Sequence, residues 1–105
     1  MSNSKQTIFA LSTPYGQSAI AVIRISGPEC LKISKELTDL EQISPRKAYF
    51  TKLYDKKRIV LDTIVLIYFK SPNSYTGEEM LEIQCHGSIS IVNKILSDLV
   101  RRASK

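Results

Sequence analysis

Two charged residues stand inside apolar segments of the sequence, where packing alone would not place them. Arg24 interrupts residues 19–25, which are otherwise apolar and rich in the β-branched side chains of a buried strand. Glu82 lies between Leu81 and Ile83 in a segment that alternates between apolar and polar residues. An ionised side chain on a buried strand is costly unless hydrogen-bond partners or an opposite charge meet it.

Each of the two charges therefore has two interpretations. Arg24 either pairs with a local carboxylate at the end of its strand or meets an anionic group or a set of acceptors from a ligand. Glu82 either faces solvent or holds its carboxylate rigidly enough to accept two N–H groups from a flat heterocycle.

The loop 70–77 and the junction at His86 add further polar and aromatic groups. The loop contains Ser-Pro-Asn-Ser-Tyr-Thr-Gly, which is dense in turn-forming residues. Within it, the ring of Tyr75 either stacks on a ligand or packs half-buried. Thr76 begins a T-x-x-E pattern that would cap a short helix. His86 either contacts a ligand or has a structural role.

Motifs for several enzyme classes are missing from the chain. It contains no G-x-x-x-x-G-K-[ST] phosphate-binding loop, no G-x-G-x-x-G and no G-x-S-x-G. One histidine and two cysteines in separate segments do not form a metal-ligand set. We therefore assign no catalytic and no metal-binding residue to this chain and expect no catalysis by it alone.

The length and composition indicate one small cytoplasmic domain that spans residues 1–105. Hydrophobic residues make up 43% and charged residues 24% of the 105 residues, which is ordinary for a globular protein. No apolar run is long enough to cross a membrane, and the first residues lack the apolar core of a secretion signal. Cys30 and Cys85 are accordingly expected as reduced, buried thiols rather than as a disulfide.

The net charge of +5 has a local origin between residues 46 and 58. Over these residues only Asp55 opposes a basic stripe, which consists of Arg46, Lys47, Lys52, Lys56, Lys57 and Arg58. The stripe would either attract RNA phosphates or other anions, or protect the edge strand of a solvated hairpin from aggregation. Tyr49, Phe50 and Tyr54 could equally be core residues, so the sequence does not indicate a surface for stacking bases.

Hydrophobic periodicity predicts an α+β domain in which two helices cover one face of a mixed β-sheet. The expected strands are residues 7–11, 19–25, 47–54, 58–69 and 80–85. The first helix is expected to begin at Pro28, and the second to follow the cap Ser88. Their apolar faces consist of Cys30, Ile33, Leu37 and Leu40 in the first helix and Ile91, Val92, Ile95, Leu96 and Leu99 in the second.

Four stretches together resemble the N-terminal domain of the tRNA-modification GTPases called MnmE or TrmE. They are residues 7–16, 19–28, 60–62 and 71–87, and they occur in the order and at the spacing of that family. The combination of I-R-I-S-G-P with P-N-S-Y-T-G-E-x-x-L-E-x-Q-C-H-G is highly specific. The resemblance extends over about residues 7–101, which is nearly the whole chain.

This resemblance implies a function that the composition does not reveal. The family's domain is similar to the tetrahydrofolate-binding domains of one-carbon enzymes, forms homodimers and binds 5-formyl-tetrahydrofolate near the dimer interface. The whole protein, with an MnmG (GidA) flavoprotein as its partner, modifies wobble uridine of tRNA at carbon 5, with the folate as one-carbon donor. GTP, with Mg²⁺ and K⁺, belongs to a separate G domain that hydrolyses it.

By motif, Arg24 and Glu82 match the family's folate-contacting positions. Glu82 would accept hydrogen bonds from the pterin, and Arg24 would meet a pterin or formyl oxygen or the glutamate tail. Tyr75, Thr76 and His86 are expected as walls of the pocket.

The chain also departs from the family pattern. Gln17 replaces an arginine of the P-G-R-G-G turn, and the later P-G-E-F-T-x-R-A-F-x-N-x-K segment with its lysine is absent. We therefore expect a truncated domain with reduced folate affinity and no GTPase activity. A free-standing RNA- or anion-binding domain, or a dimerisation scaffold without a ligand, are the alternatives.

Overall fold

A computed structural model describes residues 7–12, 19–74 and 77–103 of the chain. These residues form five strands and two helices in the predicted order, which confirms the α+β class. The elements are β1 (Ile8–Leu11), β2 (Ile20–Ser26), α1 (Cys30–Leu37), β3 (Ala48–Tyr54), β4 (Val60–Phe69), β5 (Met80–His86) and α2 (Ile89–Ala103).

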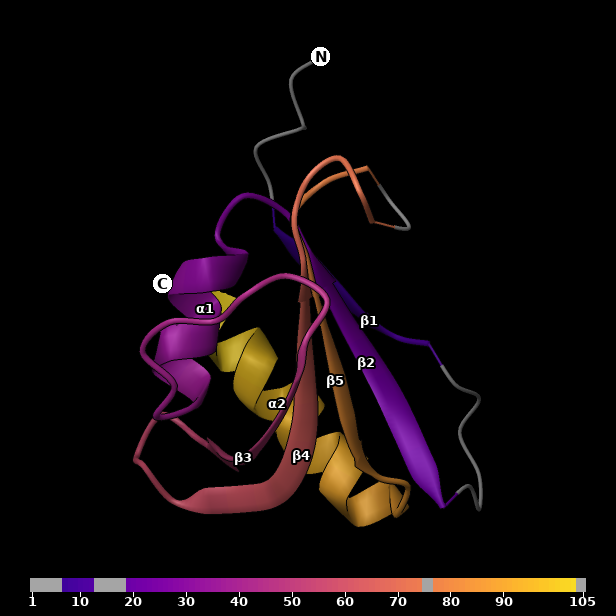
Figure 1. Cartoon of the computed structure of the whole chain (residues 1–105). Coiled ribbons are helices and arrows are strands. Elements are labelled where there is room, and N and C mark those ends of the chain that lie inside the picture. The colour runs from indigo at the N-terminus through magenta and orange to yellow at the C-terminus, as the bar shows by residue number, and fades with distance from the viewer. Residues whose placement is uncertain (1–6, 13–18, 75–76, 104–105) are drawn as a thin grey trace.

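The five strands form one sheet in the order β1-β2-β5-β4-β3 (Figure 1). All neighbouring strands in this sheet are antiparallel, so the expectation of a mixed sheet was wrong. The reason is the path after α1: the chain runs to the far edge as β3 and returns by a hairpin through β4 to β5. Within the described residues, only an isolated bridge between Pro45 and Tyr68 is parallel.

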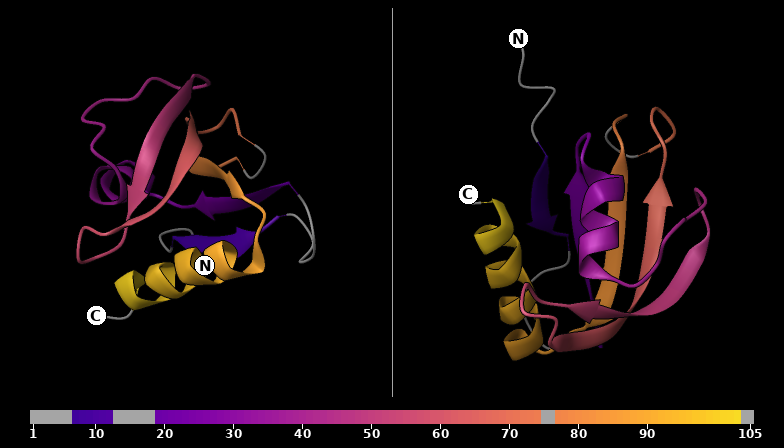
Figure 2. Two further views of the ribbon diagram at one scale, coloured as in Figure 1. Left: turned by 90° about the horizontal axis from the view of Figure 1, so that it is seen from below. Right: turned by 90° about the vertical axis from the view of Figure 1, so that its left-hand side faces the viewer.

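Both helices lie on one side of the sheet (Figure 2). The strands turn one set of alternate residues toward the helices, and Ile23, Ile83 and Leu66 lie side by side in this set. These three side chains have no exposed surface and belong to one core with Leu37 of α1 and Ile95 of α2. Burial of each large aliphatic side chain contributes about 1.5–3 kcal/mol, so this single core stabilises the domain.

No described helix covers the opposite face, which we call the open face. Its central row runs through residues that pair across the strands: Ala10, Arg24, Glu82, Ile67 and Ala48. The next row contains Val22, Gln84, Val65 and Phe50. The alternation of β5 therefore places Glu82 and Gln84 on the open face and Ile83 in the core, as the sequence pattern predicted.

Helix α1 begins two residues later than the sequence predicted, at Cys30 rather than at Pro28. Gly27 has φ +144°, a conformation that favours glycine, and its N–H donates to the Glu79 carbonyl at 2.9 Å. This turn carries the chain past Pro28 before the first helical hydrogen bond forms, from Ile33 N–H to the Glu29 carbonyl. The helix ends at Leu37, so Leu40 contacts the core from beyond its end.

The start of α2 agrees with the prediction, because Ser88 Oγ accepts the N–H of Ile91 at 3.1 Å. The β3–β4 hairpin closes through Asp55, whose Oδ1 accepts the N–H groups of Lys57 and Ile59 at 2.8 and 2.9 Å. Strand β4 begins at Val60, two residues after the predicted start, because Arg58 has φ +66° and belongs to this turn.

A candidate binding site on the open face of the sheet

Arg24 and Glu82 meet at the centre of the open face. They are direct cross-strand partners of β2 and β5, and Arg24 Nε lies 3.5 Å from Glu82 Oε1. Glu82 is only 9% exposed although no described helix covers it, whereas the Arg24 side chain is 38% exposed. Of the two alternatives for Arg24, the structure shows the pairing with a carboxylate, but from within β2 rather than from its end, and the carboxylate comes from the adjacent strand. Contact of Arg24 with a ligand stays a prediction.

Gln84 completes this cluster, and the sequence prediction missed it as a site residue. Its Nε2 donates to Glu82 Oε2 at 2.9 Å, so each Glu82 oxygen has one polar neighbour. The signal was present in the alternation, because residues two apart on a strand share a face. The cluster of Arg24, Glu82 and Gln84 is therefore a rigid arrangement of one cation, one carboxylate and one amide.

Apolar side chains lie on both sides of this polar cluster. Ile67 of β4 pairs with Glu82, and Val22 of β2 and Val65 of β4 pair with Gln84. All three are partly exposed, so the open face offers apolar surface beside a central carboxylate. Such a combination suits a flat, partly polar molecule that donates hydrogen bonds from its edge.

The loop after β4 is fixed to the sheet by two glutamates. Glu79 accepts hydrogen bonds from the Tyr68 hydroxyl and, at 3.0 Å, from the Ser71 N–H. Glu78 accepts from Ser26 Oγ at 3.2 Å. Residues 77–79 lead directly into β5, so Glu79 anchors the loop and does not cap a helix as its T-x-x-E spacing suggested. Tyr75 and Thr76, two of the predicted wall residues, lie outside the described residues.

His86 belongs to a different place on the sheet. Its Nδ1 and its backbone N–H each lie 2.8 Å from an oxygen of Asp62, whose side chain is 7% exposed. His86 is four residues from Glu82, or about 13 Å along an extended strand. The structure therefore does not bring His86 together with the Arg24 and Glu82 pair, and Asp62 is a partner that no local motif indicated.

The two cysteines are free and buried, as expected. Burial raises the pKa of Cys30 to about 12 and that of Cys85 to about 11, with the nearby carboxylates Glu79 and Asp62 adding to the respective shifts. Both residues are therefore protonated thiols at neutral pH.

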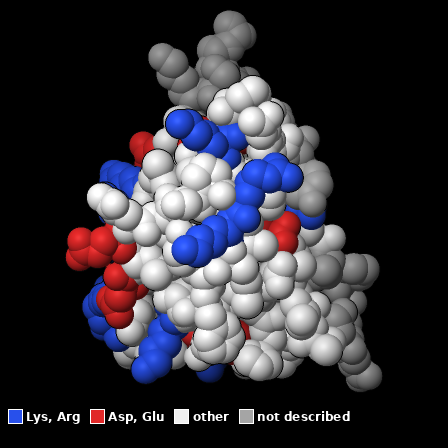
Figure 3. All heavy atoms as spheres, in the orientation of Figure 1, with Lys and Arg blue, Asp and Glu red and all other residues white. Residues whose placement is uncertain are grey.

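The basic stripe follows the edge strand β3 and does not form one continuous patch. Arg46 and Lys47 precede the strand, Lys52 lies within it, and the other three residues form the turn after it. Arg58 in that turn pairs with Asp39 and stacks over the Tyr54 ring at 4.1 Å. Figure 3 shows Lys and Arg side chains gathered over the turn that leads into β3.

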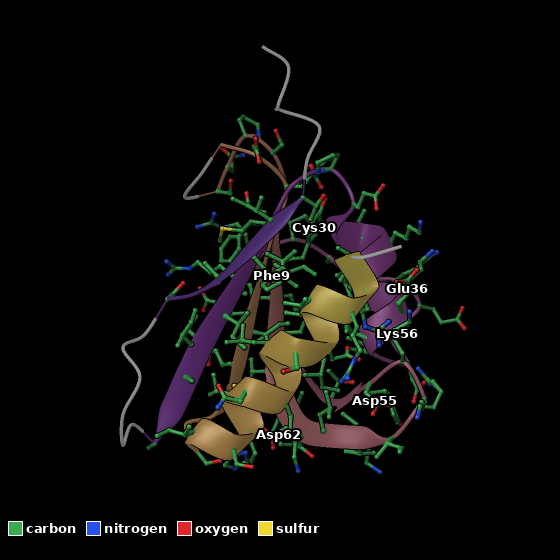
Figure 4. The ribbon with its side chains drawn as sticks, turned by 180° about the vertical axis from the view of Figure 1, so that it is seen from behind. Phe9, Cys30, Glu36, Asp55, Lys56 and Asp62 are labelled. Atoms are coloured by element: carbon green, nitrogen blue, oxygen red, sulfur yellow. The ribbon has the colours of Figure 1, made fainter. Side chains whose placement is uncertain are left out.

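A cleft of about 540 Å³ lies on the helix side of the sheet (Figure 4). Phe9 and Ile33 contribute to its apolar lining, and Glu36 and Lys56 are among the charged residues around it. Arg102, which also lines the cleft, already bonds to Asp98 at 2.6 Å. The cleft is separated by the sheet from the cluster of Arg24, Glu82 and Gln84.

The described ranges contain neither a cluster of metal ligands nor a helix able to span a membrane. Among residues 7–12, 19–74 and 77–103, no group of three or more His, Cys, Asp or Glu side chains is placed to hold a metal ion. Neither described helix has the length and apolar character needed to span a membrane.

The fold and this cluster define a small α+β domain whose antiparallel sheet carries a charged pair on its uncovered face. Residues 7–105 match the family model described as the N-terminus of the GTP-binding protein TrmE. The chain therefore belongs to the TrmE N-terminal family, which confirms the resemblance drawn from the sequence.

Curated relatives named tRNA modification GTPase MnmE show the same relationship. The chain is 41% identical to the protein from a Nitratiruptor species over 97% of its own length and 23% of that protein. It is 43% identical to the protein from a Sulfurovum species over 91% of this chain and 21% of the relative. The chain is 47% identical to the Ehrlichia chaffeensis protein over 89% of this chain and 21% of the relative. The chain thus spans about a fifth of the length of these relatives.

Proposed function

We propose that this chain is the tetrahydrofolate-binding and homodimerisation domain of an MnmE-type tRNA-modification GTPase. The observation that carries the proposal is the pair of Arg24 and Glu82, held by adjacent strands on the open face. The family match and the names of the relatives support the context of tRNA modification.

The residues on the open face fit the chemistry of a pterin. A pterin edge carries a ring N–H next to an exocyclic amine, and a carboxylate with two oxygens can accept from both. Glu82 supplies this carboxylate from a central strand, and Gln84 and Arg24 flank it with donors. Val22 and Ile67 supply apolar contacts for the flat ring. When bound, 5-formyl-tetrahydrofolate would supply the one-carbon unit.

Homodimerisation would use exposed apolar residues of the open face that lie on either side of the same pair along the strands. Ile8 of β1 is 61% exposed and Ile20 of β2 is 54% exposed, and both belong to the set of residues that faces away from the helices. Both residues would contribute apolar surface to an interface on this face of the sheet. A two-fold dimer would bury the same residues of both copies.

We assign the remaining functions to the whole protein. In the cytoplasm it would hydrolyse GTP with a separate domain, act with an MnmG-like flavoprotein and modify wobble uridine at carbon 5. This chain would contribute the folate and the dimer contact, and we assign it no catalytic residue of its own.

Calorimetric titration with 5-formyl-tetrahydrofolate tests the proposal. Arg24→Ala and Glu82→Ala should each weaken binding by about 1–3 kcal/mol, the usual cost of leaving a polar partner unpaired. Gln84→Ala should weaken binding less, because its amide orients Glu82. Glu41→Ala removes an exposed carboxylate from the segment between α1 and β3 and is the matched control.

Two results would contradict the proposal. If the folded wild-type chain does not bind the folate, the pocket is not formed by this chain. If binding is equal in Glu82→Ala and Glu41→Ala, the ligand occupies another place. Sedimentation equilibrium of wild type and Ile20→Asp tests the dimer in the same preparations. If the Ile20→Asp variant has the same dimeric mass as wild type, the interface lies elsewhere.

A further inference from the structure

The outward face of β3 carries an aromatic residue between two cations. Phe50 is 80% exposed, the largest exposed fraction among the large hydrophobic residues of the described ranges. Lys52 lies two residues after it, on the same face of the strand and also exposed. Arg46 lies four residues before Phe50, in the turn that precedes the strand.

Arg46 is held in place at its end of this row. Its N–H donates to the Tyr68 carbonyl at 2.7 Å, and its guanidinium lies 5.8 Å from the centre of the Phe69 ring. The backbone of Arg46 has φ +63°, which is uncommon for a residue other than glycine. The turn before β3 therefore fixes the direction in which this side chain leaves the backbone. The guanidinium thus lies over the outward side of β4, beside the row of β3.

The charge on the outward residues of β3 and β4 is positive. The carboxyl group of Asp39, whose pKa the Tyr54 hydrogen bond lowers with help from the Lys52 charge, lies in the segment after α1. The outward residues of the fully described strand β4 are Thr63, Val65, Ile67 and Phe69, none of which is acidic. Within the part of the chain that the structure describes, neither Arg46 nor Lys52 is placed within ion-pair distance of a carboxylate. The surface therefore favours a polyanion over a second copy of itself, because two copies would bring like charges together.

Protection of an edge strand explains Lys52 but not Phe50. Charged residues on an edge strand hinder unwanted strand pairing. An exposed aromatic ring does not, because Phe50 lies beside half-buried Val65 and adds apolar surface that faces solvent. An aromatic ring flanked by cations is the arrangement by which proteins stack an unpaired base and hold its phosphates.

We propose that the outward face of β3 binds an unpaired segment of RNA. Phe50 stacks on a base, while Lys52 and Arg46 contact phosphates on either side of it. The choice of RNA rests on the proposed role in tRNA modification, but Val65 of β4 lies between Phe50 and Gln84 of the folate cluster. Arg24 lies on β2, with β5 and β4 between it and β3.

Fluorescence anisotropy with a short labelled oligouridylate tests this proposal, and an RNA duplex of similar length serves as the second probe. The wild-type chain should bind the single strand better than the duplex. Phe50→Ala should weaken single-strand binding about 5- to 150-fold, the usual effect of removing one stacked base. Lys52→Gln should lower the slope of log affinity against log salt by about 0.7.

Control variants remove an aliphatic side chain or a cation elsewhere on the surface. Val100→Ala removes an exposed apolar side chain from α2, and Lys35→Gln removes a cation from α1. Both should bind the oligouridylate as wild type does. Circular dichroism of each variant verifies that it is folded.

Three outcomes would overturn the proposal. They are absence of single-strand binding at low salt, equal affinity of Phe50→Ala and Val100→Ala, and conversion of a wild-type dimer to a monomer by Phe50→Ala. The third result would identify the surface as an interface between copies.

Folate titration of the same variants separates the two proposals, because Phe50→Ala should keep folate binding and Arg24→Ala should keep RNA binding.

Discussion

Cys30 is a fully buried thiol whose pKa depends on the packing around it. It has no exposed surface, and its Sγ lies 3.3 Å from the Ile25 carbonyl and 3.5 Å from the Glu79 carbonyl. Burial raises the pKa of this thiol to about 12, and that of Cys85 to about 11. Because the thiolate is the reactive form, both the protonation state and the lack of access protect these residues.

We therefore predict that neither cysteine reacts rapidly with Ellman's reagent at about pH 8 in the folded state, because thiolates are scarce there. Both should react stoichiometrically in concentrated urea. The measurement is the rise of absorbance with time, with Cys85→Ala used to assign the remaining thiol. Fast stoichiometric labelling of the native chain would contradict the buried placement of Cys30.

Asp98 joins two elements that the sequence separates widely. It lies on α2 with 1% exposure and accepts the Lys56 N–H of the β3–β4 turn at 3.0 Å. It also accepts from Arg102 Nε at 2.6 Å, and Arg102 in turn donates to the Tyr54 carbonyl at 3.1 Å. The carboxylate therefore fastens the helix to the hairpin.

We predict that Asp98→Ala lowers the free energy of unfolding by about 2–4 kcal/mol, because the Lys56 N–H and the Nε of the mostly buried Arg102 both lose the carboxylate that accepts from them. Urea unfolding followed by circular dichroism measures the change. Asp39→Ala is the matched control, since it removes an exposed partner of Arg58 and solvent screens such pairs. Equal midpoints for the two variants would show that Asp98 does not join these elements.

For the molecule as a whole, the free energy of unfolding should decrease both at alkaline pH and at acid pH. On the alkaline side, burial raises the pKa values of Cys30 and Cys85 above their ordinary 9.0, and burial with the Glu79 hydrogen bond raises the pKa of Tyr68. On the acid side, the backbone N–H of Ile59 is the main cause that lowers the pKa of Asp55 below 3.8. Groups with raised pKa values stabilise the fold below their unfolded pKa, and those with lowered values stabilise it above theirs.

We predict that the free energy of unfolding falls as the pH rises from 9.0 toward about 12, where the folded state retains protons that the unfolded state releases. A smaller fall is expected below pH 3.8, because Asp55 is exposed to solvent. Urea unfolding across this pH range measures both limbs. Cys30→Ala should flatten the alkaline limb, and a stability that increases above pH 9.0 would contradict the buried thiols.

The sequence by itself determined the local features of this protein. Alternation placed Glu82 and Gln84 opposite Ile83, and helical spacing placed Leu37 and Ile95 in the core, because both patterns follow from the backbone repeat within one element. The helix cap at Ser88 and the family motifs are equally local. The element order and the α+β class could therefore be predicted without the structure.

Only the tertiary structure decided which distant segments meet. Pairing β2 with β5 brought Arg24 to Glu82, and Asp62 joined His86 across 24 residues of sequence. The sheet order also left Phe50 exposed on an edge strand, although its residue type alone suited the core equally well. Such contacts depend on hydrogen-bond register between strands and on which sheet face the helices cover, and neither is encoded in the spacing within a single segment.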